Sequence, residues 1–180
     1  KGLVWNILPM AILGICVGWV TASIVSDKIV GLLVGIIALL FVLQHVVLKQ
    51  NKNSKISLET STQAGHFWGL ISGFTSFIAH AGGPPFQIYA MPLRLDPKVF
   101  TSSSVLIFSV LNFLKIGPYL ALGRLNLNLT WSALTLMPVA ICATLLGAAI
   151  VKKMNAEIFY PIMYGFLTLI ALRLIFVSML

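Results

Sequence analysis

The chain has 180 residues, of which 59% are hydrophobic and 9% are charged, and its formal net charge is +8. A soluble globular domain carries about a quarter charged residues, so this composition excludes one and indicates a membrane protein. The basic residues lie in short segments between apolar runs, as expected for the cytoplasmic loops of a membrane protein. This placement argues against nucleic-acid binding.

Six apolar runs follow one another along the chain. Five of them have close to the roughly 20 residues that a helix needs to cross a bilayer, and the third run is longer. We therefore predict an all-α polytopic membrane protein with five transmembrane helices and one broken or re-entrant helical hairpin. The runs occupy residues 3–25, 29–48, 64–93, 99–122, 131–151 and 158–180.

The third run is interrupted by the sequence Gly82-Gly83-Pro84-Pro85. Glycine weakens a helix, and proline removes a backbone donor and clashes with the preceding turn. Within a bilayer, such a break is tolerated only where protein or a wet cavity satisfies the freed backbone groups. The break is therefore the first candidate for a functional site.

The basic residues predict how the third run lies in the membrane. If all six runs cross, five basic loop residues fall on each side, and no orientation follows. If the third run turns at residues 82–85 and returns, eight fall on one side and two on the other. The second count fits the positive-inside rule, so we predict a hairpin that opens from the cytoplasm and a C-terminus outside. The eight are Lys1, Lys49, Lys52, Lys55, Arg94, Lys98, Lys152 and Lys153, and the two are Lys28 and Arg124.

An internal repeat relates the first and fifth runs. Pro9-Met10-Ala11-Ile12 with Gly18 recurs as Pro138-Val139-Ala140-Ile141 with Gly147, at an offset of 129 residues. In the hairpin arrangement these two runs cross in opposite directions, which makes the repeats inverted, as in many transporters. The same offset places a partner for the hairpin ahead of residue 1, so we expect the chain to be about the later three-quarters of the fold.

The predicted organisation follows from this repeat. Residues 1–48 are the last two spans of the first repeat, residues 49–63 a cytoplasmic polar loop, and residues 64–180 the second repeat. The second repeat consists of the re-entrant segment 64–93 and the spans 97–122, 131–151 and 158–180. Glycines spaced four residues apart predict close helix packing. They are Gly14 and Gly18, Gly31 and Gly35, and Gly65, Gly69 and Gly73.

The fourth run carries a polar face. It begins at Asp96-Pro97, an N-cap residue followed by a proline suited to the first helical position. Lys115 lies about 27 Å from that start, so its side chain either snorkels to the outer surface or shares a cavity with Asn112. We favour the cavity, because an amide and an amine on one face of a membrane helix indicate a site. The face comprises Thr101, Ser104, Phe108, Asn112, Lys115 and Tyr119.

A hairpin tip within the membrane favours an anion, because it exposes backbone amides and the positive end of a helix dipole. Proline cannot donate, so the predicted donors are the amides of Ala81, Gly82, Gly83 and Phe86. No acidic residue lies inside any run to neutralise Lys115. We therefore expect a small anionic substrate. Its predicted site comprises His80, Ala81, Gly82, Gly83, Pro84, Pro85, Gln87, Thr101, Ser104, Asn112 and Lys115.

Two of these residues keep more than one interpretation. His80 is a proton relay, a ligand of the substrate, or a histidine packed at a helix end, and Gln87 is equally open between site and packing. The sequence contains no P-loop, zinc-spaced His/Cys set or paired carboxylate, so no metal or other cofactor is expected.

These residues resemble the sulfite exporter TauE/SafE family of membrane transporters. The resemblance implies a secondary transporter, an inverted-repeat permease that moves sulfite or an organosulfonate such as sulfoacetate by alternating access. It also implies a multi-pass protein of a cell membrane, the bacterial inner or plasma membrane, with a proton as a candidate coupling ion. The matching features are Ser72-Gly73-Phe74, Ala79-His80-Ala81-Gly82-Gly83-Pro84-Pro85, Thr101-Ser102, Asn112 with Lys115, Gly117-Pro118-Tyr119 and the unit from Pro138 to Gly147.

Two other classes of function stay open at this stage. A membrane-embedded enzyme would use His80 as a base, but it would need a nucleophile or a metal set beside that histidine. A non-transporting receptor or assembly subunit is the other alternative. We expect a permease and not an enzyme.

Overall fold

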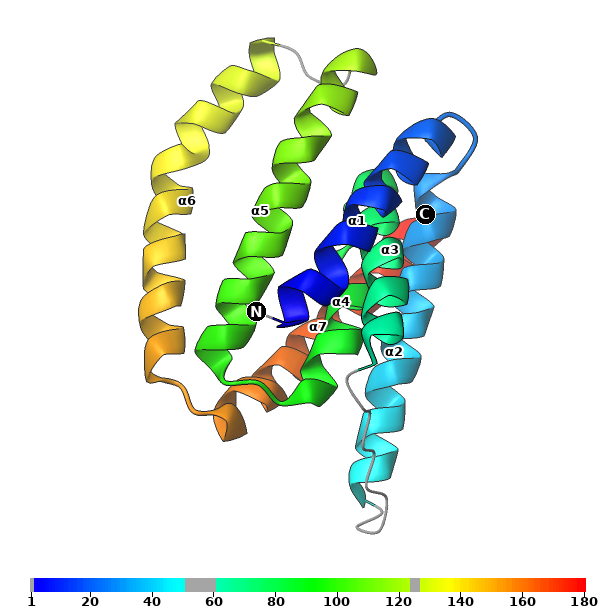
Figure 1. Cartoon of the computed structure of the whole chain (residues 1–180). Helices are drawn as coiled ribbons and strands as arrows, with labels where there is room; N and C mark the ends of the chain where they lie inside the picture. Colours follow the sequence, from blue (N-terminus) through cyan, green and yellow to red (C-terminus); the bar gives the residue numbers. More distant parts are fainter. Residues whose placement is uncertain (1, 51–60, 124–126) are drawn as a thin grey trace.

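The computed structural model describes residues 2–50, 61–123 and 127–180. Within these ranges the chain forms seven α-helices, one short 3-10 helix and no strand (Figure 1). The helices are α1 (Gly2–Thr21), α2 (Asp27–Gln50), α3 (Thr62–Ile78), α4 (Gly83–Ala90), η1 (Met91–Leu93), α5 (Pro97–Ala121), α6 (Leu127–Lys153) and α7 (Ala156–Met179).

Five helices are long and apolar enough to cross a membrane, which confirms the predicted all-α polytopic membrane protein. They are α1, α2, α5, α6 and α7. Their outer faces carry many exposed large apolar side chains, as a lipid-facing surface requires. The remaining helices, α3 and α4, belong to the long third run.

The third run is a helical hairpin, but its turn lies earlier than the sequence predicts. Helix α3 ends at Ile78, and α4 begins at Gly83. Pro84 and Pro85 therefore lie in the first turn of α4 and not in the turn between the helices. The first turn tolerates proline, because its amides have no partner within the helix. Residues 79–82 make the turn, and we call residues 79–83 the hairpin tip.

The two limbs of the hairpin run in opposite directions. Helix α3 rises from the lower end of Figure 1, α4 descends, and α5 then begins again at the lower end. The eight residues of α4 extend only about 12 Å, too short to cross a hydrocarbon core of about 30 Å. The connections from η1 to α5 and from α6 to α7 both lie at the lower end, whereas the α1–α2 connection lies at the upper end. This arrangement agrees with the predicted hairpin topology.

Helix α1 holds the hairpin through close contact with α3. A Cβ atom built on Gly69 would lie 2.5 Å from the Ile7 carbonyl oxygen, and one built on Gly73 would overlap the Ala11 carbonyl. A similar contact joins α2 to α7, where a Cβ on Gly35 would lie 2.9 Å from the Ala171 carbonyl oxygen. These contacts confirm that the spaced glycines serve close helix packing.

Helices α1 and α6, which carry the internal repeat, run in opposite directions, as an inverted repeat requires (Figure 1). Their surroundings differ. On α1, a Cβ on Gly18 would lie 2.9 Å from Phe77 Cβ. On α6, the corresponding Gly147 has no atom within 4 Å of that position, and the span of α6 has 0% of its residues buried.

Candidate functional site

The hairpin tip leaves α3 through a left-handed residue. After the C-cap Ala79, His80 has φ 53°, a conformation that favours glycine at the end of a helix. The exposed His80 ring meets the Tyr119 ring edge-on, with 5.9 Å between the ring centroids. His80 thus supplies the left-handed backbone conformation that ends α3, whatever its side chain binds.

Buried hydroxyl groups on α3 turn the tip carbonyls inward. The Ser72 hydroxyl donates to the Gly82 carbonyl over 2.8 Å, and the Thr75 hydroxyl shares its proton between the Ile71 carbonyl of its own helix, at 2.8 Å, and the Ala81 carbonyl, at 3.1 Å. Both side chains are buried. The sequence interpretation did not include them in the site, although hydroxyls one helical turn apart just before a helix break are a usable signal.

Two of the four predicted amide donors are occupied within the chain. The Ala81 amide donates to the Thr75 carbonyl over 3.1 Å, and the Phe86 amide donates to the Gly82 carbonyl over 3.4 Å. The prediction was wrong for these two because the hairpin satisfies its own backbone. Among the hydrogen bonds that the described ranges contain, none uses the amides of Gly82 or Gly83.

Gly82 lies tightly against α3, and Gly83 faces open space. A Cβ on Gly82 would lie 2.6 Å from both the Ser72 carbonyl oxygen and the Ser76 Cβ atom. A Cβ on Gly83 would meet no atom within 4 Å. The tip therefore packs against α3 at Gly82 and has open space on the side-chain side of Gly83.

Lys115 reaches the tip from α5. Its ammonium donates to the Ser76 hydroxyl over 2.9 Å and to the Ser76 carbonyl over 3.2 Å, and the residue is only 5% exposed. The alternative that Lys115 snorkels to the outer surface is therefore wrong, because the end of α3 offers acceptors closer at hand. The negative end of the α3 dipole also favours a cation at this place.

Tyr119 makes the next contact between α5 and the tip. Its hydroxyl donates to the Phe77 carbonyl over 2.9 Å, and its ring lies 5.1 Å from the Phe77 ring, centroid to centroid. Lys115 and Tyr119 lie in the last two turns of α5. The tip is therefore nearer to the far end of α5 than to its middle.

The other predicted residues are dispersed. Pro84 and Pro85 are buried in the first turn of α4, and Asn112 is exposed. Thr101 and Ser104 are partly buried several turns below Lys115, and the Ser104 hydroxyl donates to the Phe100 carbonyl of its own helix over 2.8 Å. The structure thus connects Lys115 to Gly82 of the tip through Ser76, and it leaves Asn112 on the exposed side of α5.

Gln87 contains a buried acceptor that lacks a partner. Among the described residues, its Oε1 atom is the buried side-chain polar atom without a hydrogen bond. Buried polar groups are normally paired, so an unpaired one indicates a place for a water or a ligand. Gln87 lies one turn into α4, just beyond the tip.

Negative charge is remote from this site along the chain. The described acidic residues, Asp27, Asp96 and Glu157, lie at the starts of α2, α5 and α7. Within the described ranges, no group of three His, Cys, Asp or Glu side chains is placed to hold a metal ion. The buried ammonium of Lys115 is therefore balanced by carbonyl and hydroxyl oxygens and by a helix end.

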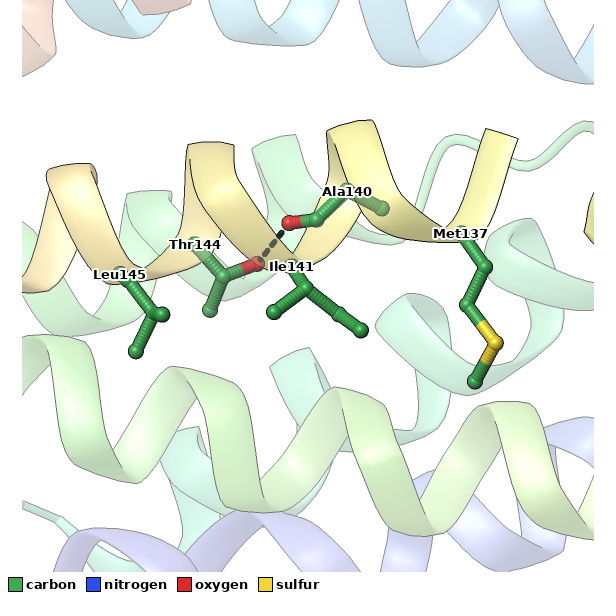
Figure 2. Close-up of a pocket in the computed structure, with 5 residues that line it drawn as sticks. All are labelled: Met137, Ala140, Ile141, Thr144 and Leu145. Carbon is green, nitrogen blue, oxygen red and sulfur yellow. Dashed lines mark hydrogen bonds between the residues drawn. The ribbon is translucent and has the colours of Figure 1, made fainter. Parts of the chain in front are cut away.

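A separate hollow of about 260 Å³ lies along one face of α6 (Figure 2). Its lining is apolar except for Thr144, whose hydroxyl donates to the Ala140 carbonyl of the same helix over 2.8 Å. The hollow offers no charge and no free polar group to a substrate, so it is not the candidate site. Its lining residues are Met137, Ala140, Ile141, Thr144 and Leu145.

The five apolar helices and the buried Lys115 ammonium define a multi-pass membrane protein with an internal polar site. The family model for the sulfite exporter TauE/SafE matches residues 1–174, and the chain belongs to this family. The match confirms the resemblance drawn from the motifs and supports a membrane transporter. No curated protein and no solved structure shows significant similarity to the chain.

Proposed function

We propose that the protein is a secondary transporter for a small anion, either sulfite or an organosulfonate such as sulfoacetate. The observation that carries this proposal is the buried Lys115 ammonium, held beside the hairpin tip where the Gly82 and Gly83 amides have no partner in the described ranges. A buried cation without a carboxylate is costly, and an anion beside it would offset much of that cost.

The amides and the ammonium would bind the oxygens of the anion together. Charge-assisted hydrogen bonds are roughly twice as strong as neutral ones, and adjacent backbone amides form a concave anion site. Gln87, one turn beyond the tip, would bond to a proton-bearing oxygen of the substrate or to a bound water. His80 and the partly buried Thr101 and Ser104 would serve the approach to the site.

Transport would proceed by alternating access. The hairpin packs closely on α1, whereas α5 contacts it through aromatic rings and two polar side chains. The ring of Phe86 on α4 lies 5.5 Å from that of Phe108, an apolar contact that small movements of α5 need not break. A shift of α5 relative to the hairpin would then open the site to one side at a time.

Two further features belong to this proposal. We place the protein in the inner or plasma membrane of a bacterium, which fractionation of expressing cells would test.

We also propose a proton as the coupling ion, with His80 as its carrier. An imposed pH gradient should then drive uptake in wild-type proteoliposomes and fail to do so in His80→Gln.

The test of the proposed function is sulfite flux in proteoliposomes, with chemical recovery of the transported anion. Lys115→Met should lower uptake by about thirtyfold or more, because loss of a buried charged partner costs at least about 2 kcal/mol of binding. The matched control is Lys98→Met, an exposed lysine in the first turn of the same helix, which should leave uptake unchanged. Unchanged uptake in Lys115→Met would refute the assignment, and recovery of a converted product would indicate an enzyme.

A further inference from the structure

We infer that Ser76 is a positioning residue of the anion site, which holds the Lys115 ammonium at the hairpin tip. This inference rests on the proposed function, because it explains how the charge of that site is kept in place. Ser76 is 4% exposed and presents two acceptors, its hydroxyl and its carbonyl, to one ammonium.

Lys115 needs such a partner. A lysine ammonium is strongly hydrated and sits on a flexible four-carbon stem, so near the end of a membrane helix it ordinarily reaches for the interface. Lys115 lies in the last two turns of α5, within reach of that interface. Its burial therefore requires an interaction that competes with hydration, and the bonds to Ser76 are the ones that the structure shows.

The C-terminal end of α3 offers carbonyl acceptors for the Lys115 ammonium. The last carbonyls of a helix have no partner within it. Here the Thr75 carbonyl accepts from the Ala79 and Ala81 amides, the Ser76 carbonyl accepts from Lys115, and the Phe77 carbonyl accepts from Tyr119. If α3 continued, later amides of the helix would bond to these last two carbonyls. Here two side chains of α5 donate to them instead.

Ser76 also connects the cation to the tip backbone. A Cβ on Gly82 would lie 2.6 Å from Ser76 Cβ and 3.2 Å from Ser76 Oγ, and the ammonium lies 2.9 Å from the same Oγ, so Ser76 is close to both Gly82 and the ammonium. An ammonium has three N–H donors, and the two bonds to Ser76 leave one for a substrate oxygen. Ser76 therefore links the position of the charge to the backbone at Gly82.

Ser76→Ala separates this role from packing. It removes the hydroxyl but keeps the Cβ atom that contacts Gly82. The readout is acetylation of Lys115 by membrane-impermeant sulfosuccinimidyl acetate in nanodiscs, quantified by peptide mass spectrometry, with exposed Lys98 and Lys152 as internal references. One lost hydrogen bond corresponds to an increase of about two- to tenfold in Lys115 labelling, and to a similar loss in sulfite affinity.

Two variants serve as controls. Ser102→Ala removes an exposed hydroxyl of α5 that bonds to the Val99 carbonyl of its own helix, and it should change neither readout. Tyr119→Phe removes the neighbouring bond to the α3 end but leaves both Ser76 acceptors, so Lys115 labelling should stay near the wild-type value.

Each outcome decides the inference. Raised Lys115 labelling in a folded Ser76→Ala protein supports it, and unchanged labelling overturns it even if sulfite affinity falls. If the wild type moves no sulfite, the transport proposal fails, yet the labelling still decides whether Ser76 holds Lys115. If Ser76→Ala does not fold, Ser76→Cys supplies a side chain of similar shape with a weaker acceptor, and the same criteria apply.

Discussion

Lys115 and Tyr119 lie one helical turn apart on α5 and donate to consecutive carbonyls, those of Ser76 and Phe77, at the end of α3. The two side chains therefore act as the C-terminal cap of a helix that belongs to another part of the chain. Because the capped end leads directly into the tip, the position of α5 and the shape of the tip depend on each other.

Tyr119→Phe should destabilise the protein by about 1 kcal/mol, because the Phe77 carbonyl loses a donor while the ring remains. Thermal unfolding in detergent measures the change. Tyr160→Phe is the matched comparison, since the Tyr160 hydroxyl donates to the Leu95 carbonyl at the foot of the hairpin over 2.8 Å. Both should lower stability, but only Tyr119→Phe should also alter sulfite uptake.

Ser72→Ala should cost about 1–3 kcal/mol in the free energy of unfolding, because it leaves the buried Gly82 carbonyl without its hydroxyl donor. The matched control is Ser102→Ala, whose hydroxyl is exposed and bonds within its own helix. Equal unfolding midpoints for the two variants would contradict the role assigned to Ser72 in fixing the tip.

Gly73→Ala should destabilise by about 1–3 kcal/mol or more, because the new Cβ would overlap the Ala11 carbonyl. Gly147→Ala on α6 is the control, since a Cβ there meets no atom within 4 Å. That control should be neutral or raise stability by about 0.5–1 kcal/mol, the usual helix preference for alanine. The comparison is made by unfolding in one detergent.

Cysteines introduced at Ser61 and Lys98 should react with an impermeant maleimide from the same side of the membrane. Both residues are exposed, and they lie at the starts of α3 and α5, which share one end of the molecule. Cysteine at the exposed Ser26, in the α1–α2 connection, should react from the opposite side. The exposed Cys16 and Cys142 must first be replaced by alanine. Reaction of Ser61→Cys and Lys98→Cys from opposite sides would show that the third run crosses.

Much of the fold could be predicted from the sequence, because its signals are local. Run length set the five spans, and the Asp96-Pro97 pair placed the start of α5, where the Asp96 carboxylate accepts from the Lys98 amide over 2.8 Å. The glycine and proline break marked the hairpin. The position of the turn was missed by a few residues because proline both interrupts a helix and begins one.

The site was less predictable, because it forms where the C-terminal end of α3 meets one face of α5. The sequence does not show which face of α5 makes that contact. The predicted polar face of α5 included Asn112 with Lys115, yet the two differ by about 60° around the helix axis. The buried line of α5 runs through Ile107, Leu111 and Lys115, which leaves Asn112 outside. The hydroxyls of Ser72 and Ser76 were missed because nothing local shows that a carbonyl ten residues later, or a lysine from α5, lies opposite them.

The left-handed backbone at His80 has a consequence for the variation that this position tolerates. Glycine, asparagine and aspartate enter that region most readily, so a saturation library selected only for a folded, membrane-inserted protein should enrich those residues at position 80. A library selected for growth that depends on anion flux should instead retain histidine if its imidazole takes part in transport. The difference between the two enrichment profiles isolates the contribution of the side chain from that of the backbone.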